Sequence, residues 1–160
     1  MKSRSFESLK FTDDFMFCAV LQENEDLCKE LVELILDVRI KGIVRTEKQK
    51  SIEITADGKG VRFDVYLEDE NNTVYDIEMQ TGADPDLAKR SRYYQGMIDL
   101  NLIGRGSDYR DLKRSYIIFI NTFDAFGYDQ CRYTFNSRCN EVEGLILGDG
   151  ITKVFLNAKG

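Results

Sequence analysis

The chain has 160 residues, of which 42% are hydrophobic and 31% charged, and its formal net charge is −6. This composition can bury one sizeable core and excludes an intrinsically disordered chain. The acidic balance excludes a surface that is basic throughout, so any nucleic-acid binding must use a local patch. No run approaches the roughly 20 apolar residues of a membrane span, and the polar start of the sequence does not resemble a signal peptide. We therefore expect one cytoplasmic domain.

The cysteines and the missing histidine restrict the chemistry further. Cys18, Cys28, Cys131 and Cys139 show no CxxC spacing, so we expect reduced, structural thiols. Without histidine, Ser-His-Asp and Cys-His catalysis are excluded, and a zinc site lacks its usual partner ligands. Chemistry that depends on carboxylates remains open.

Two helices are predicted at the start of the chain. Thr12 is the expected N-cap of the first, and Asp13 and Asp14 suit the positive dipole end of its first turn. Asn24 opens a second helix over residues 25–37, with an apolar face at helical spacing. That face is expected to comprise Leu27, Leu31, Leu34 and Ile35.

Strands are predicted after the second helix. Residues 43–54 form an expected exposed or edge strand because they carry several charges, and a tight turn at residues 57–58 leads to the next strand. Residues 62–67 and 74–80 alternate polar and apolar side chains, and the polar stretch 68–72 between them predicts a hairpin turn. The apolar face of this hairpin is expected to carry Phe63, Val65, Leu67, Tyr75, Ile77 and Met79.

The predicted hairpin sets two carboxylates against each other. Folding about Asn71 places Asp64 across from Glu78, and Arg62 across from Gln80. Carboxylates that face each other on adjacent strands, with Cβ atoms roughly 5 Å apart, repel, and a divalent cation between them would convert that repulsion into binding. Gln80 projects from the same face as Glu78 and could donate an amide proton to a group that the metal holds. The competing interpretation is an exposed sheet face that merely carries acids.

A third helix is predicted from Asp86 to about residue 103, where a glycine-rich stretch ends it. Arg90 falls inside its apolar arc, which comprises Leu87, Tyr94, Met97, Ile98 and Leu102. A charged residue on a packing face either reaches a site or extends to the rim, and both interpretations stay open. Residues 86–116 hold seven basic against four acidic residues, with tyrosines interleaved. Such a patch beside a metal would suit a DNA backbone, although a solvated helix face is the simpler alternative.

Further strands are predicted in the last third of the chain. The continuous apolar run at residues 115–121 predicts a buried central strand. Short strands are expected at residues 132–135 and 153–156, separated by polar and glycine-containing connections.

Several of these segments resemble one family. Residues 59–65, 75–80 and 89–94, which read KGVRFDV, YDIEMQ and KRSRYY, are similar to the PD-(D/E)XK nuclease family transposases, a group of recombination-promoting nucleases and putative transposases. Residues 12–17 and 154–160 extend the likeness over nearly the whole chain. The resemblance implies an α/β restriction-endonuclease-like core, with a mixed central sheet flanked by helices and a catalytic antiparallel hairpin. It also implies Mg²⁺-dependent cleavage of DNA, with Mn²⁺ as a substitute, in recombination or mobile-element processes.

The resemblance also implies roles for residues of the hairpin. Asp64, Glu78 and the backbone carbonyl of Met79 match the positions that bind the metal, which suits Mg²⁺ as a hard cation with few protein ligands. Gln80 stands where the superfamily's name has lysine, as is typical of this group, and would orient water or phosphate. Arg90 is a hypothetical source of the missing positive charge and would contact the scissile phosphate.

Other residues are candidates for supporting roles. The expected DNA contacts on the third helix are Lys89, Arg90, Arg92, Tyr93 and Tyr94. Asp13 or Asp14 could add a carboxylate to the site, with helix capping as the alternative. Residues 1–160 are expected to form one nuclease-like domain, and relatives resembling this chain continue into a helical region that it would then lack.

Two other functions compete with that of a nuclease. One is a catalytically weak or inactive descendant that binds DNA or a protein. The other is an assembly domain whose basic helix forms an oligomer interface, and a homodimer is compatible with either function. A membrane partner is not expected.

Overall fold

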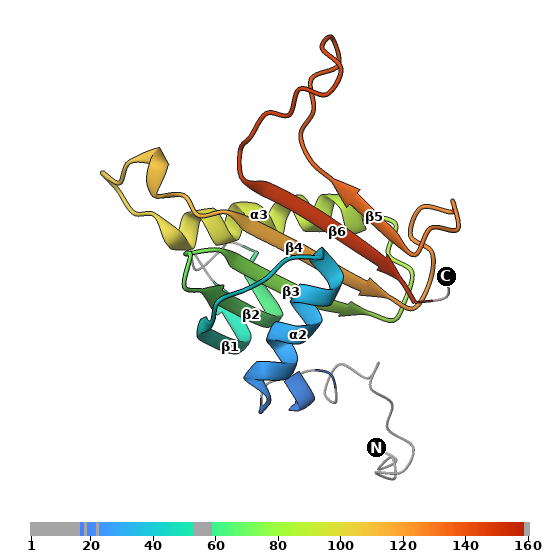
Figure 1. The fold of residues 1–160 in the computed structure, drawn as a ribbon, viewed down its shortest axis with the longest axis horizontal. Coiled ribbons are helices and arrows are strands. Elements are labelled where there is room, and N and C mark those ends of the chain that lie inside the picture. Colours follow the sequence, from blue (N-terminus) through green and yellow to red (C-terminus); the bar gives the residue numbers. More distant parts are fainter. Residues whose placement is uncertain (1–16, 18, 22, 53–58, 159–160) are drawn as a thin grey trace.

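The computed structural model describes residue 17 and residues 19–21, 23–52 and 59–158, which form a mixed sheet with a helix on each face (Figure 1). In this part of the chain six strands pair in the order β1-β2-β3-β4-β6-β5. Strands β3, β4 and β6 run parallel, and the remaining neighbours are antiparallel. The elements are α2 (Glu25–Leu36), β1 (Ile43–Ile52), β2 (Val61–Asp69), β3 (Val74–Gln80), α3 (Leu87–Leu102), the short 3₁₀ helix η2 (Tyr109–Asp111), β4 (Ser115–Asn121), β5 (Arg132–Phe135) and β6 (Ile151–Asn157).

Helices α2 and α3 cover opposite faces of the sheet, so the described residues form two apolar cores. Cys28, Val32 and Ile35 of α2 share one core with Ile77 and Ile118 of the sheet. Helix α3 and the alternate strand residues form the second core, which includes Leu87, Tyr94, Met97, Ile98, Ile117 and Phe119. A mixed sheet flanked by helices in this way is consistent with a restriction-endonuclease-like core and confirms the predicted fold class.

The central strand β4 is buried on both faces of the sheet. Ile117, Ile118 and Phe119 of β4 are all 0% exposed, because successive residues point to opposite faces and each face carries a helix. The predicted bounds of β4, β5 and α3 agree with the structure, and β1 is an edge strand as expected.

The apolar face predicted for the second helix is half right, because Ile35 is buried and Leu31 packs against the same core, but Leu27 and Leu34 are exposed. Leu34 is 81% exposed and Leu27 is 39% exposed, whereas Cys28, Val32 and Ile35 are buried. Both sets recur at helical spacing, so periodicity alone cannot choose between them. Packing against the sheet buries the set that includes Cys28.

Phe63 also departs from its predicted face. It lies on the α3 side, where its ring meets that of Tyr94 edge-on at a centroid distance of 5.2 Å, while Val65 belongs to the α2-side core. The described β2–β3 ladder ends at the Val65–Ile77 pair, so strict alternation does not extend to Phe63.

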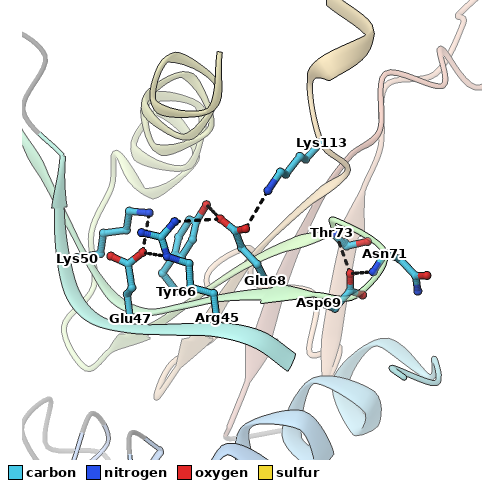
Figure 2. A network of polar contacts seen from close by, with 9 residues as sticks. All are labelled: Arg45, Glu47, Lys50, Tyr66, Glu68, Asp69, Asn71, Thr73 and Lys113. Carbon is cyan, nitrogen blue, oxygen red and sulfur yellow. Dashed lines mark hydrogen bonds and ion pairs between the residues drawn. The ribbon is translucent and has the colours of Figure 1, made fainter. Parts of the chain in front are cut away.

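A polar network holds the β2–β3 turn and the neighbouring edge of the sheet (Figure 2). Strand β2 continues to Asp69, so the turn starts later than predicted. The Asp69 carboxylate accepts hydrogen bonds from the amides of Asn71 and Thr73 at 2.9 and 2.8 Å. Nearby, Glu68 accepts from Lys113 at 2.8 Å and from the Tyr66 hydroxyl at 3.0 Å. Burial raises the pKa of Glu68, but these hydrogen bonds together with the charges of Lys113 and Arg45 hold it below its usual value.

Some expectations lie outside the described residues. These are the first helix with Thr12, Asp13 and Asp14, and the tight turn at residues 57–58. The described cysteines, Cys28, Cys131 and Cys139, are free thiols. Cys28 is buried, as expected of a structural thiol, whereas Cys131 is exposed and has no such place in the core. No described helix combines the length and apolar character needed to cross a membrane.

Candidate active site

The predicted register of the hairpin is correct for the described β2–β3 ladder, which does not include the predicted Arg62–Gln80 pair. Val65 pairs with Ile77 and Tyr66 with Asp76, which is the register that sets Asp64 across from Glu78. At that position two hydrogen bonds between the strands run from a backbone amide to a carboxylate side chain. The Asp64 amide donates to Oε1 of Glu78 at 2.9 Å, and the Met79 amide donates to Oδ2 of Asp64 at 3.0 Å. Each carboxylate is therefore oriented by the backbone of the opposite strand.

Glu78 lies deep in the site, with 1% of its surface exposed. Burial raises the pKa of its carboxyl, and the charge of Asp64 raises it further. The Asp64 amide and the guanidinium of Arg90 act in the opposite direction without cancelling these effects. Two acids thus share a confined space in which a cation would be stabilised.

Asp76 is a third acid at this site, and the sequence analysis did not assign it a role. It is 0% exposed, and neither carboxylate oxygen accepts a hydrogen bond from a donor among the described residues. Burial and then the charge of Glu78 raise its pKa well above the ordinary value, and the Glu78 carboxyl is close enough to share a proton with it. Strand alternation was an available signal, because Asp76 precedes Glu78 by two residues and so faces the same side.

Arg90 reaches this group of acids from α3. Its Nη2 donates to Oε2 of Glu78 at 2.9 Å and its Nη1 to Oε1 of Gln80 at 2.8 Å. Its Nε donates to the Tyr94 hydroxyl at 3.1 Å, and the guanidinium lies 5.1 Å from the Tyr94 ring centroid and 5.4 Å from that of Phe119. The sequence left open whether Arg90 reaches a site or extends to the rim. In the structure its guanidinium is paired with Glu78 and Gln80.

Gln80 is held by contacts at both ends of its amide. The oxygen accepts from Arg90, and the nitrogen donates to the Gly82 carbonyl at 2.6 Å. One of the two amide N–H donors predicted to serve a metal-held group is therefore engaged with the backbone.

These residues lie in an open pocket of about 820 Å³ between the start of β2 and the first turns of α3. Asp64, Glu78 and Gln80 are among its lining residues. Basic side chains also line it, together with Asp84 and Asp86; the basic residues are Lys59, Arg62, Lys89, Arg90 and Arg92. The two walls are joined where the Tyr93 hydroxyl donates to the Lys59 carbonyl. Lys59 and Arg62 were not among the predicted DNA contacts, because their proximity to α3 is a tertiary feature.

The predicted DNA contacts of α3 have different environments. Lys89, Arg92 and Tyr93 are exposed at the pocket rim. Tyr94 is only 9% exposed and supports the Arg90 side chain from below. Of the acids considered for the site, Asp13 and Asp14 lie outside the described residues.

The described part of the chain contains no group of three or more acids, cysteines or histidines arranged to enclose a metal ion. Asp64 and Glu78 are instead a pair of oxygen donors in an open pocket. Two carboxylates could hold Mg²⁺, since this ion commonly keeps several waters and binds one or two carboxylates plus substrate phosphate.

Comparison with known proteins gives one family. A family model described as PD-(D/E)XK nuclease family transposase matches residues 11–159. No curated protein and no solved structure matches the chain.

Proposed function

The chain belongs to the PD-(D/E)XK nuclease family transposases, and from this premise we propose that it is a Mg²⁺-dependent endonuclease that hydrolyses phosphodiester bonds in DNA. The observation that carries the proposal is the reciprocal pair of hydrogen bonds between Asp64 and the Glu78–Met79 segment, which brings two carboxylates together inside a basic-rimmed pocket. The family description supports a role in recombination or in mobile elements. We also infer that the protein is cytoplasmic and that Mn²⁺ substitutes for Mg²⁺.

The charges of the pocket fit a divalent cation. Asp64, Asp76 and Glu78 are mutually close acids, and Arg90 is the cation in contact with Glu78. Three acids so close together repel one another when ionised, and a divalent cation among them would reduce that repulsion. The Asp76 carboxyl is buried without a donor among the described residues, and a divalent cation beside it would favour its ionised form.

Each of the chain's residues at the site would have a separate role in binding the metal or the phosphate. Asp64 and Glu78 would hold the cation through their carboxylates. The Met79 carbonyl would be a third oxygen, because the Met79 amide already points toward Asp64 and in an extended strand the carbonyl lies on the same edge. A bound Mg²⁺ supplies an activated water and neutralises charge on the phosphate. Gln80 would orient that water or the phosphate through its amide.

The basic residues would hold the DNA backbone. The unused N–H donors of Arg90 face a pocket into which the scissile phosphate would fit, since its guanidinium has five donors and three are committed. Lys89 and Arg92 would contact flanking phosphates from the rim, with Tyr93 as an exposed ring beside them. Neutralisation of phosphates by such residues makes DNA affinity depend on salt.

A plasmid-nicking assay with Mg²⁺, Mn²⁺ or a chelator tests the proposal. We expect cleavage with either metal, none with the chelator, and none for Asp64→Asn or Glu78→Gln. Asp26→Asn, an exposed acid in the first turn of α2 on the opposite face of the sheet, is the matched control and should cleave normally. Metal-independent cleavage, or full activity of Asp64→Asn, would refute the proposal.

Arg90→Ala tests the phosphate contact in the same assay. Loss of transition-state charge stabilisation should lower cleavage by about 10²-fold or more. Cleavage that survives in Arg90→Ala but not in Asp64→Asn would remove Arg90 from the catalytic set.

One observation favours the second candidate, an inactive DNA-binding descendant. The position that the superfamily's name gives to lysine is occupied by Gln80, whose amide is engaged with Gly82 and Arg90. Salt-dependent retention of DNA without cleavage at any metal concentration would support this function. No DNA affinity together with a stable dimer would instead support an assembly domain.

A further inference from the structure

Arg90 occupies the side of Glu78 that a metal ion needs. Glu78 has two carboxylate oxygens, and Oε1 already accepts the Asp64 amide at 2.9 Å. Oε2 accepts Nη2 of Arg90 at 2.9 Å. The backbone donor belongs to the hairpin and cannot leave without opening it, whereas the guanidinium is on a side chain from another element.

The Arg90 side chain is built to stay in the pocket after that contact breaks. Its Nε is bonded to the Tyr94 hydroxyl at 3.1 Å, and its plane lies near the rings of Tyr94 and Phe119. These contacts use Nε and the face of the guanidinium and do not involve Nη2. The Asp84 carboxylate also lines the pocket and lies 3.8 Å from Nη1. A small rotation of the guanidinium would therefore bring Nη1 within hydrogen-bonding distance of Asp84.

We propose that Arg90 and the metal ion compete for Oε2 of Glu78, so that Arg90 sets the metal affinity of the DNA-free protein. This inference rests on the proposed metal site. A guanidinium and a divalent cation on one carboxylate oxygen repel each other, and metal entry therefore requires Arg90 to move from Glu78. The displaced guanidinium remains beside the pocket, held by Tyr94, where a phosphate can take it up.

The competition predicts an effect opposite to that of removing an ordinary supporting residue. A residue that only positions Glu78 would weaken metal binding when replaced. A competing cation would strengthen it. Coupling between two binding events in one protein commonly amounts to 5- to 150-fold in affinity. We expect the lower end, roughly 5- to 10-fold tighter binding, because Arg90 is 30% exposed and partly screened.

The test is titration of the intact protein with Mn²⁺ in the absence of DNA, followed by calorimetry or by the electron paramagnetic resonance of free Mn²⁺. The measurement is made at pH 8, where protons compete least for Glu78. Arg90→Gln removes the charge but keeps an amide donor near Glu78, and Arg90→Ala removes both. Thermal melting of each variant establishes that it is folded.

Lys113→Gln is the matched control. Lys113 is also a cation paired with a buried glutamate, since its Nζ lies 2.8 Å from Oε2 of Glu68 (Figure 2), but it does not line the pocket. Its replacement makes the same change in charge and removes a comparable ion pair. We expect Mn²⁺ affinity equal to that of the wild type.

The outcomes separate this inference from the proposed function. Wild-type binding that Asp64→Asn weakens, together with tighter binding by Arg90→Gln, supports both. The same wild-type behaviour with unchanged or weaker binding by Arg90→Gln overturns the competition and leaves the metal site intact. Absence of Mn²⁺ binding by the wild type and by both Arg90 variants overturns the metal site itself.

Discussion

Asp76→Asn should stabilise the protein at high pH. The carboxyl of Asp76 is fully buried, receives no hydrogen bond from the described residues, and lies beside Glu78. Burial and then the Glu78 charge raise its pKa well above the ordinary value. Asparagine has nearly the same shape, carries no charge, and can donate its amide to the Glu78 carboxylate.

The sign of the pH dependence follows from proton binding. With a raised pKa in the folded state, Asp76 keeps its proton at a pH where the unfolded chain has lost it. The free energy of unfolding therefore falls as the pH rises from the unfolded-state pKa toward the folded-state pKa. Asparagine does not titrate, so the advantage of the variant should be small near pH 5 and should grow toward pH 8.

The expected gain at pH 8 is of the order of 1–3 kcal/mol, the range for an unsatisfied buried polar group. For a domain of this size that corresponds to roughly 3–9 °C in melting temperature. The assay is urea unfolding at pH 5.5 and pH 8, with the protein free of metal. Equal stability of the two proteins at both pH values, or a loss in the variant, would refute the reasoning.

Asp69→Asn is the control on the same hairpin. Asp69 is only 3% exposed, but its oxygens accept from Asn71, Thr73 and the Tyr75 hydroxyl. An amide cannot accept all of these bonds, so this variant should lose about 1–3 kcal/mol. Opposite signs for the two substitutions would show that hydrogen bonding, and not burial alone, decides the effect.

Three further predictions concern metal, DNA and the core. Because burial raises the pKa of Glu78 and a metal must displace its proton, Mn²⁺ should bind more tightly at pH 8 than at pH 6; equal affinity in calorimetry would contradict this. Lys89→Ala and Arg92→Ala should each lower the slope of log DNA affinity against log salt by about 0.9, measured by fluorescence anisotropy, and an unchanged slope would exclude that side chain from phosphate binding. Phe119→Ala should cost about 3–5 kcal/mol in urea unfolding, whereas Leu34→Ala, on the exposed face of α2, should cost under about 0.5 kcal/mol; similar losses would contradict the two-core packing.

Local chemistry determined much of this protein before its structure was considered. Alternation with period two and a polar turn set the register of the β2–β3 hairpin, and with it the approach of Asp64 to Glu78. The apolar run of residues 115–121 and the proline and glycines around α3 set the bounds of those elements. Such signals depend on neighbours within a few residues, so they can be interpreted without knowing the fold.

Choices between equivalent faces were decided only in three dimensions. Periodicity predicted a face on α2 that includes Leu34 and Ile35, but packing against the sheet buried Ile35 with Cys28 and left Leu34 in solvent. Strand alternation put Asp76 on the side of Glu78, but only the covering by α3 removed it from water. The bond between Arg90 and Glu78 joins residues on different elements. Sequence determines what each residue can do, while burial and charge pairing depend on which elements meet, and that is a property of the whole fold.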